Sequence, residues 1–246
     1  MTVSSEWFRE WFGDAYLSLY PHRDEAEAGA GVRLYLERSG VRRTGRVLDL
    51  ACGAGRHLER LRAAGLEAVG MDLSAPLLRE AVRRPGIRGG VVRGDMRWLP
   101  FADGAFAGLV SFFTSFGYFL TPDEDAGVIS EIRRVLAPGA PFIMDYLNAR
   151  RVIDHLEPET VSELGGRHVR QSRWVDGDQV FKRIEILGSG ERDPDVFHER
   201  VRLYPPPVLE ALLSDHDLIP EARFGSYDGD PFEDDSSRLI LMGRAM

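Results

Sequence analysis

The chain has 246 residues, a formal net charge of -8 and a hydrophobic content of 43%, which is typical of one sizeable globular domain and excludes a disordered or fibrous chain. The acidic balance disfavours nucleic acid as a partner, because contacts with phosphates need clustered lysine and arginine. A single cysteine, Cys52, excludes a disulfide framework and a metal site built from several cysteines.

No signal-peptide pattern and no apolar run of about 18 residues occurs, so we expect a cytoplasmic protein without a membrane span. No histidine or acid cluster has the spacing of metal ligands, so no metal is expected.

The first segment is rich in aromatic residues at helical spacing, followed by a helix expected over residues 24–38. We therefore expect residues 1–40 to form a helical arm. Two roles are open for it. It packs its aromatic rings on the body of the domain, or it acts as a lid in which Tyr16, Tyr20 and Arg23 close the cofactor site.

Short apolar runs and helical segments then alternate. We expect strands at 46–50, 67–72, 90–93, 107–112 and 141–146, and helices at 56–64, 74–84 and 123–137. The fourth strand shows almost no polar alternation, as expected of a strand covered on both faces. This regular alternation predicts an α/β fold with a parallel sheet.

The pattern changes after Asn148. We expect three antiparallel strands at 167–175, 180–187 and 196–204, with a hairpin signal at 176–178, then a helix at 208–216 and two further strands. The interpretation is a single domain over residues 1–246. Residues 41–150 and 205–246 form its Rossmann-like core, and residues 151–204 form an inserted antiparallel β layer.

The loop after the first strand reads DLACGAG. Gly53 and Gly55 allow the backbone to turn tightly beside a ligand, where the next helix presents free N–H groups. Dinucleotides and S-adenosylmethionine are both bound by such loops. The dinucleotide pattern needs a small residue at position 58, which is Leu58 here. Asp49 would repel a pyrophosphate but suits an ammonium group, so the residues favour S-adenosylmethionine.

Acidic residues end three successive strands, namely Asp49, Asp72 and Asp95. Asp72 is placed to accept hydrogen bonds from ribose hydroxyls, as in dinucleotide enzymes. Asp95 is placed to meet the adenine amino group, with Met96 packing on the ring. Three acids along one edge of a sheet are a more specific signal than the glycines.

Four motifs make the chain similar to the class I S-adenosylmethionine-dependent methyltransferases over roughly residues 7–246. They are VLDLACGAG, VGMDLS, GDMRWLPF with DGAF, and RRVLAPGAPF. The resemblance implies a mostly parallel seven-stranded sheet of order 3-2-1-4-5-7-6, with the last strand antiparallel. It implies S-adenosylmethionine as cofactor and S-adenosylhomocysteine as product. The cofactor-binding residues it implies are Asp49, Ala51, Gly53, Gly55, Asp72, Leu73, Asp95, Met96 and Phe112. Ala51 stands where many members have glycine.

The segments after strands four and five border the place where the methyl group must project, and they supply the candidate substrate residues Thr114, Tyr118, Tyr146 and Asn148. His57 is the candidate general base. Since orientation alone accounts for much of such a reaction, no certain catalytic residue is predicted. The inserted layer resembles those of sugar-amine N,N-dimethyltransferases and of glycine or sarcosine methyltransferases, where it covers the pocket or forms a dimer.

The leading hypothesis is methyl transfer to a nitrogen or oxygen atom of a small molecule. Two alternatives stay open: RNA methylation, which the net charge disfavours, and cofactor binding without turnover. The inserted layer is expected to be either a lid or the interface of a homodimer.

Overall fold

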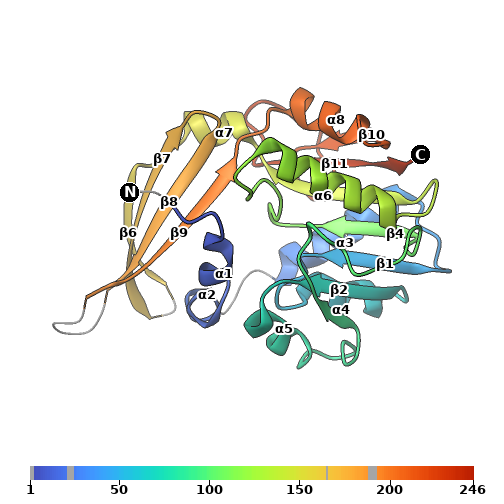
Figure 1. Cartoon of the computed structure of the whole chain (residues 1–246), viewed down its shortest axis with the longest axis horizontal. Helices are drawn as coiled ribbons and strands as arrows, with labels where there is room; N and C mark the ends of the chain where they lie inside the picture. Colours follow the sequence, from blue (N-terminus) through green and yellow to red (C-terminus); the bar gives the residue numbers. More distant parts are fainter. Residues whose placement is uncertain (1–2, 21–24, 165, 188–192) are drawn as a thin grey trace.

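The computed structural model describes residues 3–20, 25–164, 166–187 and 193–246. It contains two sheets, with the first two helices of the chain between them (Figure 1). The seven-stranded sheet consists of β1 (Arg46–Leu50), β2 (Glu67–Asp72), β3 (Val91–Arg93), β4 (Gly108–Ser111), β5 (Pro141–Leu147), β10 (Leu218–Phe224) and β11 (Arg238–Ala245).

The strand order of this sheet is β3-β2-β1-β4-β5-β11-β10. The first five strands pair in parallel, whereas β11 runs antiparallel to both β5 and β10. Because β10 and β11 are the sixth and seventh strands of this sheet along the chain, the order is 3-2-1-4-5-7-6. The predicted fold class and topology are confirmed.

Eight helices are described: α1 (Trp7–Trp11), α2 (Asp14–Leu19), α3 (Glu25–Ser39), α4 (Arg56–Ala63), α5 (Ala75–Ala81), α6 (Pro122–Val135), α7 (Ala149–Asp154) and α8 (Pro206–Ser214). Helix α6 begins with a capping box, in which Thr121 and Glu124 each accept from the other's backbone N–H, and Pro122 occupies the first turn. Helix α5 is capped by the Ser74 hydroxyl. Sequence reasoning missed only the one-and-a-half-turn helix α7.

The central strands are covered on both faces, as the missing alternation predicted. Leu48 packs in one buried cluster with Ile129 of α6, while Val47 packs in a second cluster with Val32 of α3 and Leu61 of α4. Burial of such side chains stabilises the fold by about 1.5–3 kcal/mol each. The sheet is therefore held rigidly, and its carboxyl edge is a fixed platform.

The second sheet contains β6 (Glu159–Leu164), β7 (Arg167–Asp176), β8 (Gln179–Ile186) and β9 (Asp195–Arg202), all antiparallel and in that order. Three of these strands were predicted. β6 was missed because it is an edge strand on which no residue is buried, so its sequence lacks a clear apolar face.

Helix α1 packs against β9 of the inserted sheet. The Trp11 ring is fully buried, its Nε1 donates to Glu199 Oε1 at 2.6 Å, and its centroid lies 5.1 Å from that of Phe197. On the other side, the Ser74 hydroxyl at the start of α5 donates to the Phe12 carbonyl. The arm thus connects the inserted sheet with the main domain.

Candidate functional site

A pocket of 1520 Å³ lies at the carboxyl edge of the main sheet. The loops after β1, β2, β3 and β4 form one side, and α1, α2 and strands β7 to β9 form the other. Pockets for one drug-sized ligand usually measure about 300–1,000 Å³. This pocket therefore has room for a cofactor and a second molecule.

The loop after β1 forms part of the pocket wall. Ala51 and Gly53 both line it with left-handed φ angles of 58° and 54°. Gly55 is also left-handed, but it is not on the wall: a Cβ atom there would lie 2.9 Å from Ile87 Cδ1. Gly55 therefore serves the close packing of α4 rather than the approach of a ligand.

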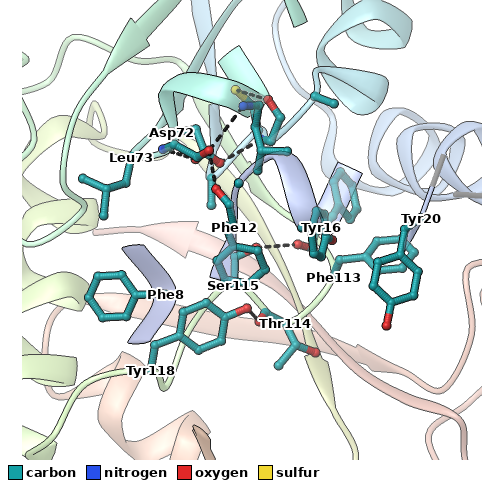
Figure 2. A pocket seen from close by; sticks show the side chains of 18 of the residues that line it. Phe8, Phe12, Tyr16, Tyr20, Asp72, Leu73, Phe113, Thr114, Ser115 and Tyr118 are labelled. Atoms are coloured by element: carbon teal, nitrogen blue, oxygen red, sulfur yellow. Dashed lines mark hydrogen bonds between the residues drawn. The ribbon is translucent and has the colours of Figure 1, made fainter. Parts of the chain in front are cut away.

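Asp72 lines the pocket beside this loop and holds it in place. Its Oδ2 accepts from the Gly53 N–H and its Oδ1 from the Ser74 N–H, both at 2.8 Å (Figure 2). Burial raises the pKa of Asp72, although these backbone donors oppose the shift. Each oxygen keeps a second lone pair for a ligand. The neighbouring Leu73 also lines the wall.

Asp49 lies behind the loop and only 1% of it is exposed. Its Oδ2 is buried and has no hydrogen-bond partner among the residues that the structure describes. Burial, and then the nearby charge of Asp72, raise the pKa of Asp49 to about 8. Two carboxyl groups under one loop, one of them incompletely paired, make this end of the pocket suitable for a cationic ligand and unsuitable for a pyrophosphate.

Asp95, at the tip of β3, lines the pocket together with Met96. Its carboxylate accepts from the Arg97 N–H at 3.1 Å, from Arg97 Nε at 3.0 Å and Nη2 at 2.8 Å, and from Arg9 Nη2 at 3.1 Å. Burial opposes ionisation, but the Arg97 hydrogen bonds and the Arg9 charge outweigh it and lower the pKa of Asp95. All four acceptor positions are used, so an adenine amino group can bind Asp95 only if one donor, such as Arg9 of the arm, leaves.

His57 borders the pocket and stacks on Phe112, another lining residue, with the ring centroids 4.3 Å apart. Burial, and then Arg56 and other arginines, lower the pKa of His57 to about 3. An imidazole of this pKa is a weak base that takes up a proton poorly at neutral pH. Its environment therefore does not support the general-base role expected from the sequence.

The turn after β4 is strained. Phe113 and Thr114 both have left-handed backbones, with φ of 63° and 52°, which is uncommon for residues other than glycine. Thr114 lines the pocket, and its carbonyl accepts from the Tyr118 hydroxyl. The Tyr118 ring stacks on Phe12 of the arm, with the ring centroids 5.9 Å apart (Figure 2).

A buried network stabilises this turn. Asp145 Oδ2 accepts from the Phe113 N–H at 2.7 Å, the Tyr227 hydroxyl at 2.6 Å and Arg238 Nη1 at 2.9 Å. Arg238 also pairs with Glu27 of α3. No local sequence pattern indicates this network, because its members lie far apart in the chain.

Two predicted substrate residues lie elsewhere. Tyr146 is fully buried and its hydroxyl donates to the Arg202 carbonyl. Asn148 caps α7, accepting from the Arg150 N–H at 3.1 Å, and its amide donates to the Ser236 carbonyl at 2.8 Å. Neither residue lines the pocket, because both side chains are used in holding the structure together.

The arm contributes Tyr16 and Tyr20 to the pocket wall. The Tyr16 ring packs edge-on against Trp11, with centroids 5.5 Å apart. Arg23, the third residue expected to form the lid, lies outside the described residues.

The match to a known protein family covers the part of the chain that forms these strand ends. Residues 47–139 match the family described as "Methyltransferase domain". Demethylmenaquinone methyltransferase of Thermus thermophilus is 39% identical over 104 residues, which are 40% of this chain and 46% of that protein. A dTDP-3-amino-3,4,6-trideoxy-alpha-D-glucopyranose N,N-dimethyltransferase of Streptomyces venezuelae is 33% identical over 112 residues, 45% of this chain and 46% of that protein. A 23S rRNA (guanine(748)-N(1))-methyltransferase of Streptomyces fradiae is 28% identical over 191 residues, 68% of this chain and 64% of that protein.

Solved structures extend the likeness over nearly the whole fold. An S-adenosylmethionine-dependent methyltransferase from Clostridium acetobutylicum has a TM-score of 0.81 at 18% identity, covering 94% of this chain and 98% of that chain. The CcbJ methyltransferase of Streptomyces caelestis has a TM-score of 0.79 at 21% identity, covering 96% and 98%. Residues 47–139 thus match a methyltransferase domain, and nearly the whole chain has the fold of these solved methyltransferases. The resemblance expected from the sequence is confirmed.

The chain covers about half of the first two curated relatives and just under two thirds of the third. The methyltransferase family match ends at residue 139, so it does not include the inserted sheet. Sequence reasoning also named no pocket residue in that sheet, although Arg173, Lys182 and Glu199 line the pocket. The alternation of charged and aliphatic residues along β8 was the available signal. In the described part of the chain, no group of acids, histidines and cysteines could hold a metal ion, and no helix is long and apolar enough to cross a membrane.

Proposed function

We propose that this protein transfers a methyl group from S-adenosylmethionine to a nitrogen or oxygen atom of a small molecule. One observation carries the proposal. The pocket beside the family-matched loop is acidic at its floor, where Asp72 lines the wall and Asp49 is buried just behind. Such a floor suits a cofactor with a sulfonium and an ammonium group.

The cofactor would be held along the strand tips. Ala51 and Gly53 would lie at its methionine end, Asp72 and Leu73 at the ribose, Asp95 and Met96 at the adenine, and Phe112 at the edge after β4. Gly55 would act from behind by packing, and Asp49 by losing its proton when the cation binds, because a nearby positive charge lowers the pKa of a carboxyl. When bound, S-adenosylmethionine supplies a methyl group that is already activated for transfer.

The remaining task of the protein is to orient the acceptor and exclude water. Orientation alone can supply an effective molarity on the order of 10^5 M. Thr114 and Tyr118 are proposed to contact the acceptor, with Tyr16 and Tyr20 covering the site from the arm. With the pKa of His57 near 3, the acceptor nucleophile should arrive deprotonated or lose its proton to water.

A small acceptor is favoured over RNA by the net charge of -8 and by the position of the pocket under the arm. Residues 151–204 are likewise proposed to form a layer that covers the acceptor. Pairing of two such layers in a homodimer is a further proposal, tested by the mass of the protein in solution.

Calorimetry with S-adenosylhomocysteine tests the proposal. We expect binding by the wild type and at least tenfold weaker binding by Asp72→Ala. Glu67→Ala is the matched control, because Glu67 is at the opposite end of β2 and its side chain is 70% exposed. Absence of binding, or equal binding by wild type and Asp72→Ala, would overturn the proposal.

The acceptor class is tested with methyl-labelled cofactor and fractionated cell extract. We expect label in the small-molecule fraction. Label in RNA would contradict the proposal and indicate RNA methylation instead. Cofactor binding without transfer of label to any fraction would indicate a protein that binds the cofactor without turnover.

A further inference from the structure

The far end of the pocket is formed by the inserted sheet. Arg173 of β7, Lys182 of β8 and Glu199 of β9 are aligned across neighbouring strands, on the face that meets Trp11 of the arm. All three residues line the pocket, and the lining also includes the apolar residues Leu147, Val152, Leu156, Val180 and Val201. This end therefore combines an apolar wall with a row of three charged groups.

Two of these charges neutralise each other. Lys182 Nζ lies 2.5 Å from Glu199 Oε2, and Glu199 Oε1 accepts from Trp11 Nε1 at 2.6 Å. Both oxygens of the Glu199 carboxylate are engaged. Glu199 therefore offers little to a second cation nearby.

The third charge, on Arg173, has only neutral partners. Its Nη1 donates to Thr160 Oγ1 at 3.0 Å and its Nη2 donates to Gln171 Oε1. None of the ion pairs between described residues includes Arg173. Lys182 stands directly opposite it, and like charges in that arrangement are destabilising. A half-buried guanidinium without a counter-charge is costly unless a ligand supplies one.

Some other arginines of the pocket, Arg9 and Arg84 among them, have carboxylate partners. Arg9 pairs with Asp95, and Arg84 pairs with Glu25 and Glu59, all near the cofactor loops. Arg93 forms no ion pair with a described carboxylate, but it donates to the Leu73 carbonyl and is exposed at the opposite end of the pocket. Arg173 is thus distinguished by its place on the acceptor side.

We propose that Arg173 binds an anionic group of the methyl acceptor, a carboxylate or a phosphate, while the apolar body of the acceptor lies along Val152, Val180 and Val201. The planar fork of a guanidinium matches either anion with two parallel hydrogen bonds. Thr160 and Gln171 orient the fork from behind. This inference rests on the proposed methyl transfer and names the chemistry of its acceptor.

The experiment uses the full chain saturated with S-adenosylhomocysteine and three probes: 4-phenylbutyrate, phenyl phosphate and the neutral 4-phenylbutanol. Calorimetry should give at least tenfold tighter binding for one or both anions than for the alcohol. Arg173→Gln should reduce this preference to below twofold, and Arg173→Lys, which keeps the charge, should retain part of it. Arg93→Gln is the matched control and should keep the full preference. The anion that binds tighter distinguishes carboxylate from phosphate.

Equal binding of the three probes by the wild type would overturn the inference. So would a preference that persists in Arg173→Gln, or one that is lost equally in Arg93→Gln. If circular dichroism shows that Arg173→Gln does not fold, Arg173→Lys becomes the test of the inference. A folded lysine variant that keeps the full preference for the anions over the alcohol, or loses it completely, would contradict the bidentate contact. Binding of S-adenosylhomocysteine is measured separately, so its failure refutes the proposed function rather than this site.

Discussion

Asp49→Asn should make the protein more stable near neutral pH. The Asp49 carboxyl is almost completely buried, and its folded-state pKa is raised to about 8, first by burial and then by the charge of Asp72. In the unfolded chain its pKa is about 3.9. A carboxyl whose pKa is raised by folding contributes stability below the unfolded value, and this contribution is lost as the pH rises toward the folded value.

The magnitude follows from these two pKa values. At pH 7 the unfolded chain releases a proton that the folded chain largely keeps, which costs about 4 kcal/mol at about 1.36 kcal/mol per pH unit. Asparagine avoids this loss, but its amide would stand where Asp49 Oδ2 has no partner among the described residues. An unpaired buried donor costs about 1–3 kcal/mol, so the net gain is about 2 kcal/mol. For a domain of this size, the melting temperature should rise by about 4–8 °C.

Urea denaturation of wild type and Asp49→Asn between about pH 5 and about pH 8 measures the effect. The stability difference should widen with rising pH, because only the wild type loses stability at Asp49. The neighbouring charges of Asp72 and Arg56 are present in both proteins. Asp103→Asn, at a side chain that is 82% exposed, is the control and should show no such trend. A variant that is less stable than wild type at every pH, or a difference that narrows with pH, would refute the reasoning.

Three further predictions follow from the site. Deleting residues 1–23 should weaken S-adenosylhomocysteine binding at least tenfold by calorimetry, because α1 and α2 line the pocket; unchanged affinity would leave the arm a packing element. Arg238→Met should lower the unfolding free energy in urea by about 3 kcal/mol, since it leaves the buried Asp145 carboxylate without its cation; a loss below about 1 kcal/mol would contradict the network. Gly55→Ala should lower the unfolding free energy by about 2 kcal/mol or more, because the new Cβ would lie 2.9 Å from Ile87. Gly53→Ala, whose Cβ would lie 3.9 Å from Leu77, should lower it by about 1 kcal/mol and mainly weaken cofactor binding. Equal stabilities of the two alanine variants would refute this division.

The sheet was predictable from the sequence because its strands are apolar runs separated by clear turns and caps. β4 is buried at all four positions, and α6 carries both its capping box and its Pro122 in the sequence. The positions of β10 and β11 in the sheet came from the family resemblance, since a strand's neighbours are not encoded in its own pattern. β6 was not recognised even as a strand, because an edge strand without buried residues does not need an apolar face.

The wall of the candidate site was predictable where it consists of strand ends. Asp72 and Asp95 line the pocket because parallel strands end at one edge. Tyr146 was misplaced because β5 is buried at every position except its last, Leu147, so the sequence does not tell which of its faces meets the pocket. Arg173 was not found for a similar reason, since only the packing of α1 on β9 determines which face of the inserted sheet is turned toward the ligand.

The crystal structure of the protein with S-adenosylhomocysteine tests the central claim most directly. We expect the product in the pocket, with its ribose hydroxyls on Asp72 and its methionine end beside Ala51 and Gly53. An adenine on Asp95 should be accompanied by displacement of Arg9. Product bound away from the strand tips, or absent from the pocket at saturating concentration, would contradict the account.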